Sequence, residues 1–414
     1  MMKYEFECFN KTKELLKLEN VPEYWENTWK TSMEIIPETN IPFLEDRWLL
    51  GINSILKLPE EVIDVLLGTA RIIRLDPLLA RFAWHCHYLL FETDLASNPW
   101  SCVFPSLHRY MGQKESLFYI LILISGTDRI LKFNEAKGIP HDVTAHTFSD
   151  LKLWMTEYFH QHGRWGLEKV IILWLIFHFT GRLYRLGRLQ FVFCTCSLDI
   201  IVYRNKKDRS VIVLSAPGVQ FRDDGQVDGT NDIYDREHAW LSQLKVEEGY
   251  VIGNPISPDG FAIRKMVELK EDEWVQVLAK GAPVLDIHIP GDSRMDHGEC
   301  VESMRRAKEF FSRHFPERSV HAFTCTTWLF DAQYQKLLPE SSNIVKFQKE
   351  FHLVPVLGYD NNTLIRVFGG QPADLSSAKR DTQLRRVILD HMAAGGHIRD
   401  TGGCTLMEDV DWKK

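Results

Sequence analysis

The chain has 414 residues, of which 45% are hydrophobic and 25% charged, and its net charge is -7 at pH 7. The length favours two domains with separate cores, and the composition excludes a disordered chain. The negative charge leaves no basic footprint for DNA, RNA or anionic lipid, so we expect neither a nucleic acid nor a membrane as partner.

The sequence also indicates a cytoplasmic protein without a metal site. Its first residues include no apolar signal segment, and its most apolar stretches are shorter than the ~20 residues that span a bilayer. The eight cysteines form no CxxC pair, which argues against a zinc ribbon or a redox dithiol. The loop DGQVDGTNDIYD resembles a calcium-binding EF-hand loop, but Gln226 and Asp235 replace the usual ligands, so we expect a connecting loop.

Residues 1–185 are predicted to form an all-helical N-terminal domain. Segments 58–75, 76–95 and 147–163 carry apolar residues at helical spacing, with many Trp and Phe side chains among them. Beyond residue 185 the period changes from helical to alternating, which predicts a second domain over residues 186–414.

The second domain is predicted to hold a mixed β-sheet flanked by helices, an α+β fold. Two β-rich runs flank the charged turn RNKKDRS. The elements expected after them are strand 284–290, helix 298–314, strand 319–329, helix 332–351 with a break at Pro339, strand 353–359, strand 363–369 and a final helix in DTQLRRVILDHMAAGG. The strand–helix–strand order makes the first two of these strands parallel neighbours, and YDNNT between the last two predicts a hairpin turn.

The strand predicted at 284–290 carries two polar residues. Alternation places the aliphatic residues at 285, 287 and 289 on one face and Asp286 and His288 on the other. Crossover helices tend to cover both faces of such a strand, so these side chains are either hydrogen-bonded in the core or line a cleft. In a cleft, His288 would suit a general base near neutral pH.

A loop suited to an anion follows this strand. GDSRMDHGEC contains Gly291, Arg294 and Gly298, and its Asp296 opens a D-x-x-E capping box. The loop leads into a helix whose N-terminus presents free N–H groups and the positive end of the helix dipole. This arrangement indicates a place for a phosphate, although such joins also occur for packing alone.

The next predicted strand, SVHAFTCTTWLF, carries His321, Cys325 and Thr327 on one face. A Cys–His pair can act as nucleophile and base, whereas a buried Cys is normally inert. Both roles remain open for Cys325.

Several motifs together resemble a known family. They are HIP at 288, Ser303 followed by the pair at 310 and 311 and by HFPE, CTTWLF at 325, LLPESSNIVKFQKEF at 337 and GGH at 395. In this order they resemble acyltransferases with a helical N-terminal domain and a GNAT-like C-terminal domain. LYRLGRLQF at 183 is similar to the join between those domains, so the resemblance spans nearly the whole chain.

The resemblance implies acyl-CoA or acetyl-CoA as cosubstrate, and no metal. The cosubstrate would lie where strands 284–290 and 319–329 splay apart, with its pyrophosphate on the loop from 291 to 298. The residues that the resemblance assigns to it are Ile289, Gly291, Ser293, Arg294, Gly298, Ser303 and Asn343.

The implied chemistry is direct transfer of an acyl group from the thioester to an amine or hydroxyl of a small-molecule or peptide acceptor. His288 or Asp286 would take the acceptor's proton, directly or through water. A backbone N–H of the same strand would polarise the thioester carbonyl, and Tyr359 would protonate the departing thiolate.

A departure from the family pattern leaves other functions open. Ordinary GNAT enzymes carry a Gln or Arg followed by Gly-x-Gly or Gly-x-Ala in the phosphate loop, and PGDSRMDHGEC does not match this pattern. The main alternative is therefore a non-catalytic ligand-binding or regulatory module with a degenerate GNAT fold. A hydrolase or transferase that depends on Cys325 is a third hypothesis.

Overall fold

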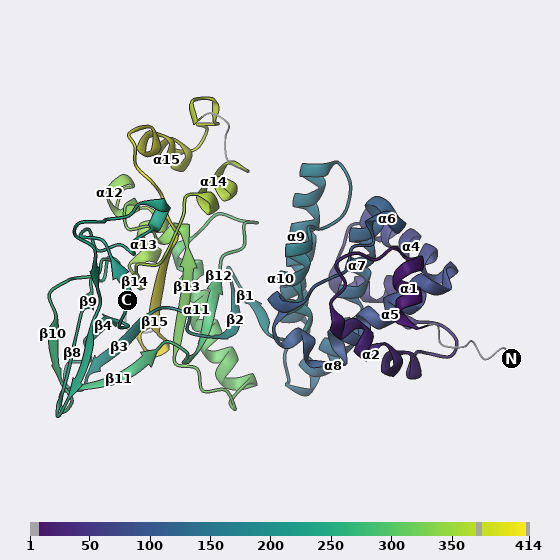
Figure 1. Ribbon diagram of the computed structural model, residues 1–414, viewed down its shortest axis with the longest axis horizontal. Helices are drawn as coiled ribbons and strands as arrows, with labels where there is room; N and C mark the ends of the chain where they lie inside the picture. The colour runs from purple at the N-terminus through teal and green to yellow at the C-terminus, as the bar shows by residue number, and fades with distance from the viewer. Residues whose placement is uncertain (1–7, 370–374, 411–414) are drawn as a thin grey trace. The chain divides into compact units, whose positions relative to one another are not determined.

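The computed structural model describes residues 8–369 and 375–410. The chain divides into two compact units, Met1–Leu186 and Gly187–Lys414, beside the change of sequence period near residue 185 (Figure 1). The first unit is helical and the second contains the β-sheets, so the predicted α+β fold is confirmed.

The described part of the first unit consists of helices around one hydrophobic core. The helices are α1 (Phe9–Leu15), α2 (Glu23–Glu34), α3 (Asp46–Leu56), α4 (Glu60–Leu75), α5 (Pro77–Phe91), α6 (His108–Met111), α7 (Glu115–Ile124), α8 (Thr127–Ala136), α9 (His141–His162) and α10 (Lys169–Phe179), and strand β1 (Leu183–Leu186) ends the unit.

Local sequence signals explain how these helices begin and pack. The Asp76 carboxylate caps α5 by accepting hydrogen bonds from the N–H groups of Leu78 and Leu79 at 2.9 and 3.2 Å, and Pro77 occupies the first helical position. α7 is apolar around its whole circumference, and every residue from Leu117 to its end is buried. It therefore lies in the middle of the helical core.

A buried acid joins two of these helices. Asp150 on α9 is 2% exposed, and its Oδ2 accepts hydrogen bonds from the indoles of Trp154 and Trp174 at 3.1 and 2.9 Å. The same oxygen lies 3.1 Å from Nε2 of His178 on α10, whose side chain is fully buried. Because an ionised group in a core is costly unless it is paired, these contacts make Asp150 a fixed link between α9 and α10.

Two histidines in α5 should make the stability of the helical unit depend on pH. Burial lowers the pKa of His85 from 6.5 to about 4, and burial together with the charge of Arg129 lowers that of His87 to about 4. Both rings stay neutral in the folded unit, so below pH 6.5 the unfolded chain binds more protons and folding stability falls until about pH 4. Each ring contributes about 1.4 kcal/mol per pH unit crossed.

Urea denaturation at pH 7.0, 6.0 and 5.0 measures this loss. The His85→Gln variant, which keeps hydrogen-bonding groups for the partners of His85, Ser32 and the Trp25 carbonyl, should show a shallower decline of the unfolding free energy with falling pH than the unmodified protein. Equal slopes would contradict the assignment of this pH dependence to His85.

The second unit combines strands and helices. Its strands, as far as the structure describes them, are β2 (Leu189–Thr195), β3 (Ile200–Asn205), β4 (Val211–Ser215), β5 (Gln220–Phe221), β6 (Trp240–Leu241), β7 (Leu244–Glu247), β8 (Tyr250–Gly253), β9 (Pro255–Ile256), β10 (Val267–Lys270), β11 (Trp274–Ala279), β12 (Pro283–His288), β13 (Ala322–Thr327), β14 (His352–Val354) and β15 (Thr401–Leu406). Its helices are α11 (His297–His314), α12 (Tyr334–Leu337), α13 (Asn343–Gln348), α14 (Asn361–Phe368) and α15 (Gln383–Ala393).

The main sheet of this unit has the strand order β2-β12-β13-β15-β14. β12 pairs antiparallel with β2 and parallel with β13, and β15 runs antiparallel to both of its neighbours. The crossover helix α11 packs on β2, where Phe311 contacts Phe193 with ring centroids 4.8 Å apart. The parallel pair joined by a crossover helix is thus as predicted.

The end of the sheet differs from the prediction. Residues 363–369 were expected as a strand of a hairpin, but 363–368 belong to α14, because Thr363, Leu364 and Val367 are buried at helical spacing while Ile365 is exposed. β14 also ends at Val354, before the expected 359.

A further difference is β15, which lies between β13 and β14 and was not predicted. Its sequence TGGCTL is short, contains two glycines and is buried at all six positions, so it shows no alternation. Gly403 is required by packing, because a Cβ atom there would lie 2.6 Å from the ring of Phe330.

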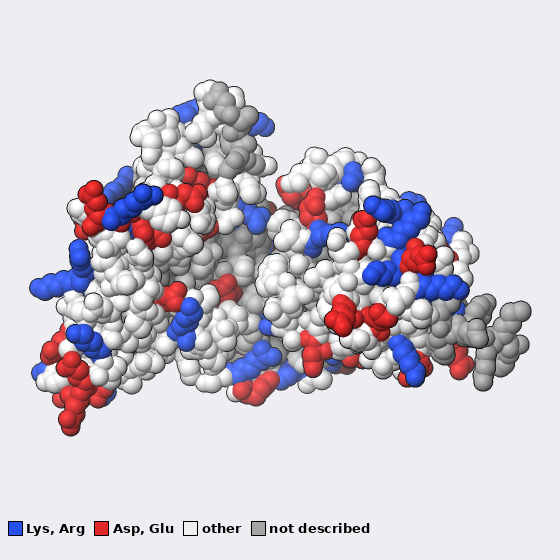
Figure 2. Space-filling view, in the orientation of Figure 1, with Lys and Arg blue, Asp and Glu red and all other residues white. Residues whose placement is uncertain are grey.

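The remaining strands form smaller sheets, with the orders β11-β3-β4-β9, β10-β8-β7 and β5-β6. β3 and β4 form a hairpin around the charged turn, as the sequence predicts. Exposed acids gather at the turns after β7 and after β10 (Figure 2). Among the described residues, no helix combines the length and apolarity that crossing a bilayer requires.

Candidate functional site

The two parallel strands β12 and β13 part at their carboxyl ends. They pair at Leu285 with Phe323 and at Asp286 with Thr324. Beyond these pairs each strand continues along its other neighbour, β12 along β2 as far as His288 and β13 along β15 as far as Thr327. The pairing between the two strands therefore ends before either strand does, and their ends diverge.

Asp286 and His288 form a pair beside this divergence. The Oδ2 atom of Asp286 lies 3.1 Å from Nε2 of His288, and its Oδ1 atom accepts a 2.7 Å hydrogen bond from Thr324 on β13. The side chains of His288 and Asp286 are 40% and 28% exposed. They are thus not sealed in the core, and their lining of a cleft stays a prediction.

The loop after β12 is held from inside the unit. Arg188 donates hydrogen bonds to the carbonyl oxygens of Ser293 and Arg294 at 3.0 and 3.2 Å, and Asn343 on α13 donates to the carbonyl of Met295 at 2.9 Å. The Asp296 carboxylate caps α11 by accepting from the N–H of Glu299 at 3.0 Å. The carbonyl groups of Ser293, Arg294 and Met295 thus all accept hydrogen bonds from side chains of the protein.

This arrangement leaves a row of amide donors. In a trans peptide the C=O and the following N–H point in opposite directions, so the N–H groups of Arg294, Met295 and Asp296 point away from Arg188 and Asn343. None of the three donates a hydrogen bond within the described structure. Successive unpaired N–H groups at the start of a helix form an anion-binding concavity.

The predicted cosubstrate residues divide into two groups. Gly291, Ser293 and Arg294 are exposed on this loop, Gly298 is exposed in the first turn of α11, and Ile289 is partly buried at the start of the loop. These five remain predicted contacts.

Ser303 and Asn343 serve the protein itself. Ser303 is 1% exposed and its hydroxyl accepts a 3.0 Å hydrogen bond from the N–H of Leu189; its contact with the cosubstrate stays a prediction. The Asn343 amide supports the loop through Met295 and is a positioning residue here.

Tyr359 lies in the connection between β14 and β15. It is 38% exposed and follows β14 by five residues, and β13 and β15 lie between β14 and β12. Its role in protonating the departing thiolate stays a prediction.

Cys325 is a core residue. Its side chain is 1% exposed, and burial, with smaller contributions from Asp286 and Cys300, raises the pKa of its thiol well above the usual range. Because the nucleophile is the thiolate, a thiol that stays protonated argues against the hypothesis of a catalytic Cys325.

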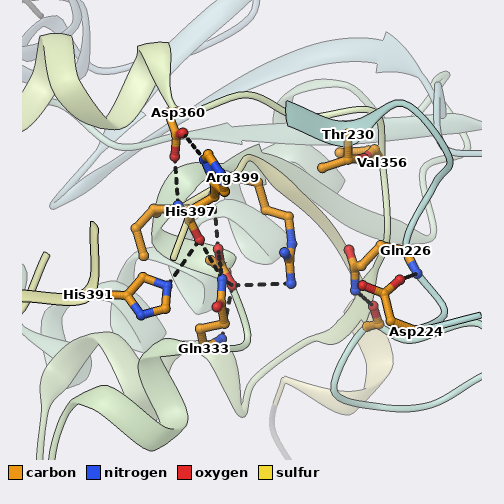
Figure 3. Close-up of polar contacts among 12 residues, drawn as sticks. Asp224, Gln226, Thr230, Gln333, Val356, Asp360, His391, His397 and Arg399 are labelled. Carbon is orange, nitrogen blue, oxygen red and sulfur yellow. Dashed lines mark hydrogen bonds and ion pairs between the residues drawn. The ribbon is translucent and has the colours of Figure 1, made fainter. Parts of the chain in front are cut away.

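The loop at 224–235 uses its acids for internal hydrogen bonds. Asp224 accepts from Arg222 at 2.9 Å and from the N–H of Gln226 at 3.0 Å, and Asp228 accepts from the N–H of Asp235 at 2.8 Å. The Gln226 amide donates to the Gly260 carbonyl at 3.2 Å; Figure 3 shows Asp224 beside Gln226. Within the described ranges no group of three His, Cys, Asp or Glu side chains is placed to hold a metal ion.

Sequence reasoning missed a polar network between α14 and β15 (Figure 3). Asp360 accepts from Nδ1 of His397 at 2.5 Å and from the N–H of Ile398 at 2.7 Å. Behind it, the fully buried Asp331 accepts from the N–H of Arg399 at 2.9 Å. The only sequence signal was the GGH motif, which does not reveal its distant partner.

Models of two protein families match the chain. Residues 49–181 match the N-acyltransferase N-terminal domain, and residues 183–405 match the GNAT-like C-terminal domain. The chain belongs to the GNAT-like N-acyltransferases. The resemblance inferred from the motifs is therefore confirmed.

Solved structures share the fold of this GNAT-like N-acyltransferase. An acyltransferase mutant in complex with octanoyl-CoA is 19% identical with a TM-score of 0.65, and the match covers 96% of this chain and 99% of that one. An acyltransferase in complex with decanoyl-CoA and teicoplanin is 19% identical with a TM-score of 0.63 and the same coverage. No curated protein matches the chain.

Proposed function

We propose that this protein transfers an acyl group from acyl-CoA directly to an amine or hydroxyl of a small-molecule or peptide acceptor. The observation that carries the proposal is the divergence of β12 and β13 beside the Asp286–His288 pair. The octanoyl-CoA, decanoyl-CoA and teicoplanin in the structures of similar fold support the same donor class and an acceptor that includes peptides.

The loop after β12 fits a diphosphate. It offers the N–H groups of Arg294, Met295 and Asp296, the exposed Arg294 side chain and the N-terminus of the 18-residue helix α11. Its sequence lacks the usual glycine pattern, but Arg188 and Asn343 turn the carbonyl groups inward by hydrogen bonds. Side-chain contacts thus supply a geometry that glycines allow in other loops.

His288 is proposed as the general base. As the acceptor nitrogen or oxygen bonds to the thioester carbon, it must lose a proton, and the carbon–sulfur bond breaks. His288 takes that proton and can return it to the sulfur, so atoms and charge balance. Asp286, fixed by Thr324, holds the imidazole and stabilises its protonated form. A backbone N–H group of β12 would donate a hydrogen bond to the thioester carbonyl and polarise it.

Arg294→Ala tests the phosphate loop. In isothermal titration with octanoyl-CoA, we expect the variant to bind roughly 10- to 100-fold more weakly, because a hydrogen bond to a charged group contributes about 1.5 to 3 kcal/mol. The matched control is Arg313→Ala, an exposed arginine in the last turn of the same helix α11, which should bind unchanged. Equal affinity of all three proteins would contradict the loop assignment.

The acidic residues of the loop after β12 are a reason to test the alternative, a non-catalytic ligand-binding module. Asp292, Asp296 and Glu299 surround the row of N–H groups, and their charge opposes an anion. A protein that binds octanoyl-CoA but releases no CoA thiol with any amine would be such a module. Absence of any acyl-CoA binding would overturn the proposed function altogether.

A further inference from the structure

The connection between β14 and β15 lies at the same end of the sheet as His288. β13 is parallel to β12, and β15 runs antiparallel to β13, with Thr401 paired to Thr327. The start of β15 therefore lies at the end of the sheet where β12 and β13 finish. Figure 1 shows α14 and α15 beyond this end of the sheet.

A second His–Asp pair occupies this connection. Nδ1 of His397 lies 2.5 Å from Oδ2 of Asp360, and the other oxygen of Asp360 accepts from the N–H of Ile398. Because Asp360 is an acceptor, Nδ1 carries the proton and Nε2 of a neutral ring presents a lone pair. Nε2 has no hydrogen-bond partner among the described residues, and the His397 side chain is 42% exposed.

The backbone around His397 is fixed by buried polar groups. The Gln333 amide donates to the His397 carbonyl at 2.7 Å and also to Asp331 at 3.0 Å, and Asp331 in turn accepts from the N–H of Arg399 (Figure 3). A ring whose position is set by a carboxylate and a rigid support, with its second nitrogen open, is a preorganised hydrogen-bonding group. Packing alone does not require this arrangement, because the ring is exposed.

We propose that His397, oriented by Asp360, is a specificity-determining residue that binds a hydroxyl of the acceptor; this rests on the proposed function. His397 precedes β15, which is separated from β12 by β13. We therefore assign His397 to a part of the acceptor away from the amine that reacts at His288. It accepts a hydrogen bond from a hydroxyl distal to the reacting amine, and the acceptor class is an amine with such a distal hydroxyl.

The test compares two amines with octanoyl-CoA as donor, 8-amino-1-octanol and n-octylamine. They share the reactive amine and differ in the distal hydroxyl. We expect the unmodified protein to prefer the amino alcohol by about 3- to 10-fold in kcat/KM, the effect of one hydrogen bond. The preference should reside in the KM of the acceptor. His397→Ala should abolish it and leave the rate with n-octylamine and the KM of octanoyl-CoA unchanged.

Two further variants separate recognition from folding. His397→Gln, which offers an amide oxygen, should retain part of the preference, and Asp360→Asn should lose it while circular dichroism and melting remain close to those of the unmodified protein. A preference that survives His397→Ala, or its absence in the unmodified protein, overturns the inference.

Failure of the proposed function has a different signature. If neither amine is acylated although octanoyl-CoA binds, acyl transfer to amines is rejected. Calorimetric binding of 8-amino-1-octanol in the presence of CoA then decides the inference by itself. Equal affinity of the unmodified protein and His397→Ala would overturn it, and weaker binding by the variant would support it.

Discussion

His288→Ala is expected to lower kcat for acyl transfer from octanoyl-CoA by about 100- to 10,000-fold, the usual contribution of a positioned general base. The affinity for octanoyl-CoA should not change, because the imidazole acts on the acceptor and not on the loop that holds the phosphates. Release of CoA thiol measures turnover, and isothermal titration measures binding.

His321→Ala is the matched control, since His321 immediately precedes β13 at the opposite end of the sheet and its ring contacts Ser319. It should retain full activity. Asp286→Asn should reduce kcat less than His288→Ala, because the amide still holds the ring but does not stabilise its protonated form. Full turnover in His288→Ala would exclude this residue as the base.

Asp150→Ala is expected to reduce the free energy of unfolding of the helical unit by about 3 to 5 kcal/mol, as is typical when one member of a buried ion pair is removed. The substitution takes away the acceptor for the indoles of Trp154 and Trp174 and the partner of the buried His178. Urea denaturation followed by tryptophan fluorescence measures the loss.

Two variants bracket this result. Asp150→Asn keeps an acceptor oxygen for the indoles and should lose less stability than Asp150→Ala. Glu34→Ala removes an exposed ion pair with Lys30, 4.0 Å apart, and should change stability by at most about 0.5 kcal/mol. A loss for Asp150→Ala as small as that for Glu34→Ala would show that the buried cluster contributes little.

The elements that carry the proposed site could be predicted because their signals are local. Alternation in 284–288 placed Asp286 and His288 on one face, and the helical spacing that follows identified α11 and the loop between them. The strand–helix–strand order also made β12 and β13 parallel neighbours. The sequence could not show that these strands diverge, because divergence depends on β2 and β15 drawing their ends apart.

The contacts that individual side chains make depend on residues far away in the sequence. Ser303 is spaced as a helix residue near the loop, yet its hydroxyl bonds to Leu189, more than a hundred positions earlier. β15, from the end of the chain, inserts between β13 and β14. Such pairings join segments far apart in sequence, and no local period encodes them.

By itself, the sequence determined the helical and alternating patterns, the family resemblance and the polar face of one strand, because each depends on residues within a few positions of one another. Only the tertiary structure decided that α14 is a helix, that β15 completes the sheet, and that His397 meets Asp360. These depend on burial against distant segments, where packing overrides local propensity.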